Sequence, residues 1–411
     1  MTATALQQEE HLPEAIVCKW CGKSFHYLKS HISMGRCENI PESAKGLDVD
    51  EVVKMYTSAF PDEPTISRTA LAKLNEKRAE KHSGEGKVAE ISAHPGYAGT
   101  VEYKTELVAA HELLGVTIKE LGTPRGKPLQ VTVNVNTPYP EFVPEAKKNY
   151  VYGDFDLIKD IFMMLEIGIP GYLWGHAGTG KSSLPTQLCA LLNRPLIRAQ
   201  HTASMEEAHV TGQILARDGS TYFEPGLLAL AMKNGWVYLA DEYDFAFPQI
   251  LGVYQPVLEG EPLIIKEATP DWRRITPHKR FAFIGTGNTN GSGDETGLYQ
   301  GTNIQNAANF SRFGIVSNVK YMSTKAEVNM LAEAGVIREY AEKMVKFANL
   351  VREGYEQHLI SQPIGPRELL LSVKIGMMRG DFSAGIEKSF INKLPSTSAQ
   401  AAREVVQKIF G

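Results

Sequence analysis

The sequence predicts an α/β protein with a parallel β-sheet flanked by helices, followed by a helical lid. A small cysteine-rich module and a mixed linker region precede the sheet. Three observations carry this prediction: a glycine-rich turn between a buried strand and a helix, two later apolar strands that end in polar residues, and three cysteines within the first forty residues. Strands that alternate with helices are typical of parallel sheets, because a crossover must carry the chain back to the same edge.

Composition narrows the class of protein. The chain has 411 residues, of which 43% are hydrophobic and 22% charged, with a net charge of −4. This length exceeds one ordinary core, so two or three domains are expected. No apolar run approaches the roughly 20 residues that span a bilayer, and residues 1–10 lack the basic and apolar regions of a secretion signal. We therefore expect a cytoplasmic protein without a membrane partner.

Residues 175–182 match the pattern G-x-x-x-x-G-K-[ST] at every fixed position. Residues 167–174 predict a short buried strand before this loop, and residues 183–192 predict a helix after it. Backbone N–H groups and the helix dipole then point at phosphate, which indicates an ATP site rather than a chance glycine-rich turn. The predicted nucleotide contacts are Gly175, His176, Ala177, Gly178, Thr179, Gly180, Lys181, Ser182 and Ser183.

A second apolar strand, residues 236–240, ends in Asp241 and Glu242. A parallel sheet places both carboxylates at its carboxyl edge, beside the phosphates. We predict that Ser182 and Asp241 hold Mg²⁺ and that Lys181 neutralises the β- and γ-phosphates. Glu242 is predicted to orient and deprotonate the attacking water, so the expected reaction is hydrolysis of ATP to ADP and phosphate. The alternative is an acidic strand end that begins a helix, where carboxylates are favoured anyway.

A third apolar strand, residues 280–287, ends in a polar amide at Asn288. In this order the motifs resemble the AAA+ ATPases of the MoxR and chelatase branch, most closely the CobS-type ATPase subunit of cobaltochelatase. The resemblance covers about residues 150–390 and leaves out the cysteine-rich module. It also rests on residues 241–244, the glycine-rich segment 288–302, residues 311–313 and residues 365–367.

The resemblance implies three further roles. Asn288 would be sensor 1 and help to position the water, and Arg312 would be the arginine finger that reaches the site of the next subunit. Arg367 would be sensor 2, contacting the γ-phosphate from the lid, in its own subunit or in the next. Ser311 and Gly365 depart from the acidic residue and the serine usual there, and an ordinary surface arginine is the alternative for Arg312. An ATP site that is completed by an arginine of the adjacent subunit needs a head-to-tail interface that closes into a ring, so a homo-hexamer is expected.

Two insertions and a lid complete this region. Residues 211–224 predict a hairpin around an Asp-Gly turn, and residues 262–277 fall where the family carries another hairpin. The resemblance implies that both line or cap a central channel, with packing between subunits as the alternative. Residues 327–356 and 367–378 have apolar residues at helical spacing, as a helical lid requires. The second insertion contains Lys266, Trp272, Arg273 and Arg274.

The cysteine-rich module predicts a zinc site. Cys18 and Cys21 form a C-x-x-C pair, and His31 and Cys37, expected on a following short helix, would complete a tetrahedral Cys3His set. Clustered cysteines in an unsecreted chain indicate metal rather than disulfides. The segment resembles a shortened zinc finger, with Phe25 and Leu28 as its small core. His26 is a competing ligand, and free thiols on a disordered arm are the alternative.

The partner of the finger stays open in the sequence. Four basic residues suit a phosphate backbone: Lys19, Lys23, Lys29 and Arg36. One finger reads only about three base pairs, too few for useful specific affinity. Docking to a protein is therefore an equal alternative.

The linker region is the least informative part. Residues 51–81 are helical in character, residues 81–87 and 93–100 are rich in turn formers, and residues 129–135 alternate as a strand does. A small linker domain and an extended arm on a neighbouring subunit fit equally well. The expected domains are a zinc finger at 15–40, the linker region at 41–148, the AAA+ nucleotide-binding domain at 149–322 and the lid at 323–411.

The sequence therefore predicts an ATP-hydrolysing ring motor that remodels a protein partner, of chaperone or chelatase-subunit type. The alternative is an ATPase that translocates or remodels DNA or RNA through its finger and channel hairpins. The macromolecular substrate is unidentified, and a protein is favoured over nucleic acid. A scaffold that does not hydrolyse ATP is disfavoured by the intact Lys181, Asp241 and Glu242.

Overall fold

The structure is a computed structural model that describes residues 13–33, 36–45, 47–61, 63–70, 102–217 and 220–411. It divides into two compact units, Met1–Ser92 and Ala93–Gly411. In the part of the chain that it describes, no helix is long and apolar enough to cross a membrane.

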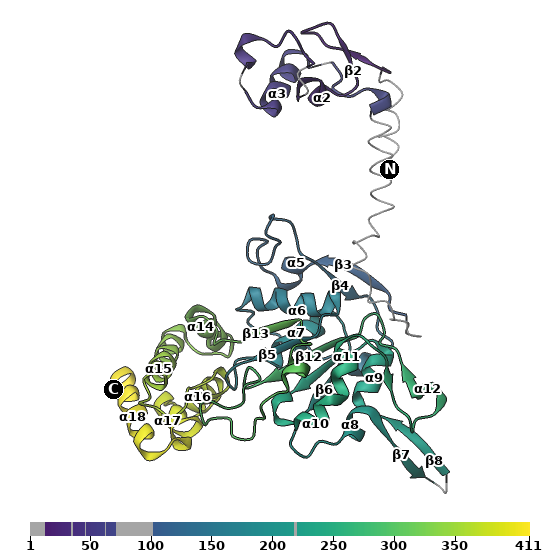
Figure 1. The fold of residues 1–411 in the computed structure, drawn as a ribbon. Helices are drawn as coiled ribbons and strands as arrows, with labels where there is room; N and C mark the ends of the chain where they lie inside the picture. The colour runs from purple at the N-terminus through teal and green to yellow at the C-terminus, as the bar shows by residue number, and fades with distance from the viewer. Residues whose placement is uncertain (1–12, 34–35, 46, 62, 71–101, 218–219) are drawn as a thin grey trace. The chain divides into compact units, whose positions relative to one another are not determined.

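The larger unit is built on one five-stranded parallel sheet (Figure 1). Across the sheet the strands are β13 (Ile315–Asn318), β5 (Gly171–Trp174), β12 (Ala282–Gly287), β9 (Val237–Asp241) and β6 (Leu196–Gln200). The three strands that the sequence predicted are the adjacent central strands β5, β12 and β9, and all pairings are parallel. Their carboxyl ends therefore meet at one edge, which confirms the predicted α/β fold.

Helices cover both faces of this sheet (Figure 1). On one face lie α6 (Phe155–Ile167) and α7 (Ser183–Leu191). On the other lie α9 (Leu227–Asn234), α10 (Pro248–Leu251) and α11 (Gln255–Leu258). Successive strand residues feed opposite faces, as Tyr172 and Leu173 do in β5. Both faces are thus closed by apolar packing, which leaves the carboxyl edge as the place for chemistry.

The helix α6 explains why the first strand is shorter than predicted. Asp154 caps its start by accepting from the Leu157 N–H at 3.0 Å, and Gly168 ends it in the left-handed region at φ 72°. Residue 167 therefore belongs to the helix, and the strand begins only at Gly171.

Part of the linker region packs on its own nucleotide domain. β3 (Thr105–Ala109) and β4 (Gln130–Asn134) form an antiparallel pair, which confirms the predicted strand; α5 (Ala110–Leu114) follows β3 and η2 (Pro140–Phe142) follows β4. The Asn134 amide donates to Asn193 O at 2.8 Å, and the Phe142 ring stacks on Trp236 at 4.2 Å. The turn-rich segments 81–87 and 93–100 lie outside the described residues.

The insertions also match their prediction, and they contact each other. In the first insertion α8 (Glu207–Thr211) leads into β7 (Gly212–Arg217), which pairs antiparallel with β8 (Ser220–Pro225). In the second, β10 (Leu263–Ile264) pairs antiparallel with β11 (Arg274–Ile275), and α12 (Pro270–Arg273) lies between these two strands in the sequence. The Asp-Gly turn of the first hairpin lies outside the described residues. Trp272 is half-buried against Phe223 of β8, with the Lys233 ammonium 3.8 Å from its ring centre. Trp272 therefore joins the two insertions by packing.

The lid is a separate group of helices with its own core, as predicted (Figure 1). It consists of α14 (Thr324–Glu333), α15 (Arg338–Glu356), α16 (Pro366–Arg379), α17 (Phe382–Ser389), η5 (Ile391–Lys393) and α18 (Ser396–Phe410). Phe347, Leu369 and Phe390 are buried in its centre. The predicted helix over 327–356 is interrupted after Glu333, because Gly335 takes a left-handed conformation at φ 94°.

A buried ion pair holds the lid helices together, and we expect its loss to be costly. The Arg352 guanidinium donates to both oxygens of Glu327 at 2.7 and 2.8 Å, and the Glu327 side chain is 0% exposed. Arg352→Ala would strand this carboxylate in the core and lower the free energy of unfolding by about 3–5 kcal/mol. Arg338→Ala, which breaks an exposed pair with Glu342, should cost less than about 1 kcal/mol. The measurement is urea unfolding, monitored by hydrogen exchange of the lid amides. If Arg352→Ala and Arg338→Ala lower the free energy of unfolding equally, the assigned role of the buried pair is wrong.

The N-terminal unit has the ββα order of a zinc finger and extends beyond it. β1 (Ile16–Val17) and β2 (Ser24–Phe25) pair antiparallel and precede α2 (Leu28–Ser33). η1 (Glu42–Ala44) and α3 (Val49–Ala59) follow, and Tyr56 of α3 is buried in the same core. The helix predicted over 51–81 is interrupted, because α3 ends ahead of Pro61 and the chain is helical again only at residues 68–70. Residues 71–81 lie outside the described part of the chain.

Candidate nucleotide and metal sites

The glycine-rich loop lies at the carboxyl end of β5 and leads into α7. Gly175 has φ 148°, and a Cβ on it would stand 2.4 Å from Val319 O, so only glycine fits there. Lys181 extends back along the loop, and its Nζ donates to Gly175 O at 2.7 Å, His176 O at 2.9 Å and Asn288 Oδ1 at 3.1 Å. The loop lysine and the Asn288 amide are thus in direct contact.

Lys181 is buried near three carboxylates. Burial lowers its pKa to about 8, although the carboxylates of Asp244, Asp241 and Glu242 favour the charged form. A triphosphate would add opposite charge at the same place and strengthen the protonated state. The loop lysine is therefore positioned as a phosphate ligand.

Asp241 ends β9 and accepts hydrogen bonds from three other segments of the chain. Ser182 Oγ and Thr286 Oγ1 donate to its Oδ1, and Arg198 Nε donates to its Oδ2 at 2.6 Å. Burial would raise the pKa of Asp241, but the Ser182 and Thr286 hydrogen bonds and the Arg198 charge hold it below its usual value. A hydroxyl beside a carboxylate is a pair of hard oxygen donors, which fits Mg²⁺.

Glu242 follows in a left-handed conformation, with φ 53°. Its N–H donates to Thr286 Oγ1 at 3.1 Å, and its exposed carboxylate accepts from Gln200 Nε2 at 2.6 Å. A non-glycine residue at positive φ costs about 1 kcal/mol or more and persists where the surroundings enforce it. From this turn Glu242 lines the cavity described below.

Asp244 holds the turn that contains Asn288 and Thr289. It is 0% exposed and accepts from Asn288 N at 2.8 Å, from Thr289 N at 2.9 Å and from Thr289 Oγ1 at 3.0 Å. Burial raises the pKa of Asp244, and these hydrogen bonds partly offset that shift. These hydrogen bonds therefore join the residues that follow β12 to Asp244, which lies two residues after Glu242 in the sequence.

A cavity of about 860 Å³ contains most of the predicted site residues. This volume lies within the roughly 300–1,000 Å³ of ligand sites. Arg367 stands at the start of α16, with its Cβ 3.6 Å from where a Cβ on Gly178 would be, so it faces the loop of its own chain. The cavity is lined by residues 177–183, Arg198, Asp241, Glu242, Asn288, Arg367 and Lys374, among others.

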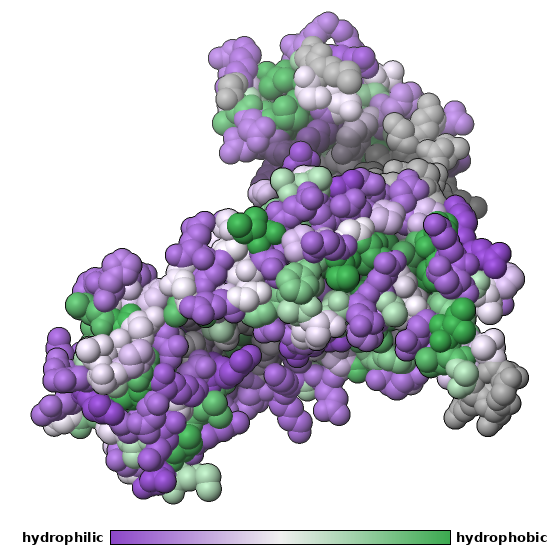
Figure 2. Space-filling view, turned by 60° about the horizontal axis from the view of Figure 1, so that its bottom comes forward, coloured by the Kyte–Doolittle hydropathy of each residue, from purple (hydrophilic) through white to green (hydrophobic). Residues whose placement is uncertain are grey.

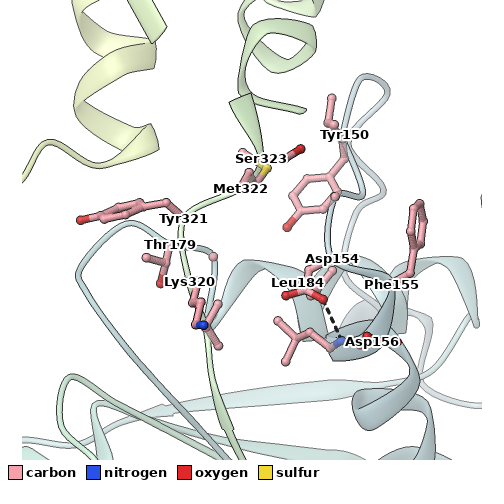
Figure 3. A pocket seen from close by; sticks show the side chains of 15 residues that line it. Tyr150, Asp154, Phe155, Asp156, Thr179, Leu184, Lys320, Tyr321, Met322 and Ser323 are labelled. Carbon is pink, nitrogen blue, oxygen red and sulfur yellow. Dashed lines mark hydrogen bonds between the residues drawn. The ribbon is translucent and has the colours of Figure 1, made fainter. Parts of the chain in front are cut away.

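A smaller pocket of about 290 Å³ adjoins this cavity and shares Tyr150, Thr179 and Gly180 with it. Figure 3 shows Tyr150, Met322 and Leu184 around one space, while the Tyr321 ring points away from it. These apolar side chains suit a flat ring more than phosphate. The two spaces meet at the glycine-rich loop: the larger one contains Lys181, Asp241 and Arg367, and the smaller one has apolar side chains beside Asp154, Asp156 and Lys320.

Arg312 does not line this cavity, and among the predicted nucleotide contacts Gly175 and His176 do not line it either. Arg312 follows α13 (Ala307–Phe310), and its Nε donates to Glu259 Oε1 at 2.7 Å. A second nitrogen donates to Ala308 O, and a quarter of the side chain is exposed. Within one chain, Arg312 therefore does not reach the nucleotide site.

Several side chains at the site were not predicted. Tyr299 of the glycine-rich segment accepts from the Ala177 N–H at 3.0 Å and lies 3.0 Å from His176 Nδ1. Arg198 and Gln200 reach the acidic pair from β6. The exposed and buried residues of this strand alternate, but the sequence does not reveal that β6 lies beside β9.

The N-terminal unit brings four potential metal ligands together. The donor atoms of Cys18, Cys21, His31 and Cys37 all lie within 4.8 Å of one another. His26 is not part of this set, because its Nδ1 lies 3.0 Å from Ser67 Oγ. Cys37 follows α2 rather than lying on it, which corrects the prediction of a helical Cys37. Three thiols and one imidazole at this spacing fit tetrahedral zinc.

Three of the four basic residues that the sequence indicated in this unit are paired with carboxylates. Lys19 contacts Glu63 at 2.8 Å, Lys29 contacts Asp50 at 2.5 Å, and Lys23 contacts Glu38. The basic surface that the sequence indicated is therefore largely neutralised within the unit.

The sheet order, the loop lysine and the acidic strand end define this protein as an ATPase of the AAA+ class. Residues 172–302 match the family model of the AAA domain (dynein-related subfamily). The chain is 32% identical over 249 residues to the aerobic cobaltochelatase subunit CobS of Sinorhizobium sp, which covers 58% of this chain and 74% of that protein. The chain therefore belongs to the CobS family of AAA+ ATPases.

Other relatives are more distant. An uncharacterized protein of Staphylococcus aureus (strain NCTC 8325 / PS 47) is 23% identical over 265 residues, which are 62% of this chain and 96% of that protein. Among solved structures, the RuvB Holliday junction branch migration motor of Thermotoga maritima superposes with a TM-score of 0.38 at 13% identity, covering 65% of this chain and 72% of RuvB.

Proposed function

We propose that the protein is a ring-forming, Mg²⁺-dependent ATP motor that remodels a protein partner, of chaperone or chelatase-subunit type. One observation supports this most: Lys181, Asp241, Glu242, Asn288 and Arg367 converge on a single cavity. The assignment to an ATPase family with a chelatase subunit agrees with it.

In this proposal the larger cavity holds the triphosphate. Lys181 and the N–H groups of residues 178–183 bind the phosphates, and Ser182 and Asp241 hold Mg²⁺, which supplies charge neutralisation at the β- and γ-phosphates. The adenine ring of ATP occupies the smaller pocket beside Tyr150 and Met322 (Figure 3). Arg367 contacts the γ-phosphate from the lid of the same chain.

Hydrolysis needs a base and a water position at the γ-phosphate. Glu242 takes the proton of the attacking water, while Gln200 orients this carboxylate and Asn288 orients the water. These three groups come from three adjacent strands, so the rigid sheet sets their spacing.

Arg312 supports a site between subunits. Its guanidinium is held outside the cavity by Glu259 and stays a quarter exposed, so a neighbouring copy can receive it. A contact that delivers the arginine of one chain to the site of the next is heterologous, and it closes into a ring. We propose a homo-hexamer.

The N-terminal unit would be a zinc-stabilised docking module. Because Lys19, Lys23 and Lys29 are already paired with carboxylates, these three residues offer less charge to a phosphate backbone. Figure 2 shows mostly hydrophilic residues on the viewed face, with hydrophobic ones in small separate groups. A protein partner that recognises shape and hydrogen bonds is therefore favoured over nucleic acid.

Removal of zinc should unfold this module and spare the motor. The predicted ligands sit in the same small core as Ile16, Phe25 and Leu28, which is too small to fold without metal. A zinc-selective chelator in excess Mg²⁺ should abolish hydrogen-exchange protection over residues 13–60 while ATP turnover continues. Cys37→Ser should lose bound zinc, whereas Cys189→Ala, in α7, should retain it. Unchanged protection after complete zinc removal would refute the module.

The test of the function is capture of the partner. Glu242→Gln protein with ATP should retain a specific protein that is absent when residues 1–70 are deleted. Deletion of residues 1–70 should not change the binding of a labelled oligonucleotide at low salt. Tight, salt-dependent oligonucleotide binding that requires them would favour the nucleic-acid motor instead, with the exposed Lys266, Arg273 and Arg274 as its contacts.

A further inference from the structure

Arg198 is an unexpected cation in the nucleotide cavity. It projects from the edge strand β6 toward β9, and its Nε and Nη2 both contact Oδ2 of Asp241. It lines the cavity together with Lys181 and Arg367. Its side chain is 56% exposed, in contrast to 3% for the carboxylate that it contacts. An exposed guanidinium is thus paired with a buried carboxylate.

This pair uses up the acceptor capacity of Asp241. An ionised carboxylate offers about four lone-pair positions. Ser182 and Thr286 donate to Oδ1, and two nitrogens of Arg198 contact Oδ2. A Mg²⁺ ion, or a water bound to it, would need one of these positions. The hydroxyls come from the loop and from β12, so the exposed Arg198 is the group that can leave.

We propose that Arg198 is a counterion that competes with Mg²⁺ for Asp241 and is displaced when the metal binds. The inference rests on the proposed role of Asp241 as a magnesium ligand. A Mg²⁺ ion at Oδ2 would repel the guanidinium that contacts the same oxygen, so binding of the metal weakens the Arg198 contact. Arg198 thereby sets how strongly nucleotide binding depends on the metal.

Two opposite changes follow for Arg198→Ala. Without its competitor, Mg²⁺ should bind more tightly, and half-maximal Mg²⁺ should fall about three- to tenfold. Without metal, the negative charge of Asp241 would face the phosphates uncompensated. Nucleotide affinity in EDTA should therefore fall by a similar factor. Arg198→Lys, which keeps the charge and loses the two-nitrogen contact, should lie between the variant and the wild type.

The experiment titrates a fluorescent, non-hydrolysable ATP analogue onto the full-length protein, first in EDTA and then at fixed analogue with rising Mg²⁺. Bound Mn²⁺, measured by electron paramagnetic resonance, gives a second readout of metal affinity. Arg338→Ala is the matched control, since Arg338 is an exposed, ion-paired arginine on the lid. Asp241→Asn tests the site itself and should abolish the effect of Mg²⁺ on affinity.

The outcomes separate the two ideas. If Asp241→Asn keeps the full Mg²⁺ effect, the proposed magnesium site is wrong. If that effect is lost but Arg198→Ala titrates like the wild type, the counterion role alone is overturned. Changes of both affinities in the same direction would also overturn it, because they indicate that Arg198 merely supports the fold of the site.

Discussion

Replacement of Glu242 by Gln is expected to stop ATP turnover while ATP remains bound. The carboxylate lines the cavity from a turn at positive φ and accepts a hydrogen bond from Gln200. In the proposed mechanism it is the group that takes the proton of the attacking water. Positioned general bases contribute about 10²–10⁴ in rate, and we expect a loss in this range. The amide keeps the shape and can still accept from Gln200, so nucleotide affinity and assembly should stay unchanged.

Steady-state phosphate release and nucleotide titration measure this difference. Glu356→Gln is the matched control, because it removes an exposed carboxylate at the end of a lid helix, and its turnover should equal that of the wild type. Turnover of Glu242→Gln within tenfold of the wild type would remove Glu242 from the role of base.

Arg312→Ala is expected to silence hydrolysis without affecting the site in its own chain. Arg312 contacts Glu259 and Ala308 and does not line the cavity. An arginine supplied from outside the site contributes about 10³–10⁵ in related phosphoryl-transfer enzymes, so turnover should fall by at least about 10³. Affinity for ATP should change little, and Arg338→Ala again serves as the control for loss of an exposed arginine.

Mixed assemblies decide whether the arginine acts across a subunit boundary. An Arg312→Ala subunit keeps Glu242, and a Glu242→Gln neighbour keeps Arg312, so their shared site is complete. Mixing the two inactive proteins under subunit exchange should therefore restore part of the activity. No recovery, with exchange verified by labelled subunits, would place the function of Arg312 elsewhere.

The sequence predicted the parts of the nucleotide site that depend on local order. The loop at 175–182 and the strand ends at Asp241 and Asn288 are contiguous motifs, and parallel pairing alone brings their ends together. Arg198 and Gln200 could not be predicted in the same way. Their contacts depend on β6 being the neighbour of β9, and this order is not visible in the spacing along the chain.

The N-terminal unit shows a second limit. The grouping of its four potential metal ligands could be predicted because their residue types and spacing are typical of metal sites. The charge of its surface could not, since Lys19 is neutralised by Glu63 and Lys29 by Asp50, far along the chain. Net local charge in a sequence window therefore overstated the basic character of the finger.

The most direct measurement is a cryo-EM structure of the Glu242→Gln protein assembled with ATP and Mg²⁺. The account predicts a triphosphate on the N–H groups of residues 178–183, with Ser182 and Asp241 at the metal and Arg312 of an adjacent protomer at the γ-phosphate. An assembly in which nucleotide fills the cavity while every Arg312 remains on Glu259 of its own chain would contradict the account.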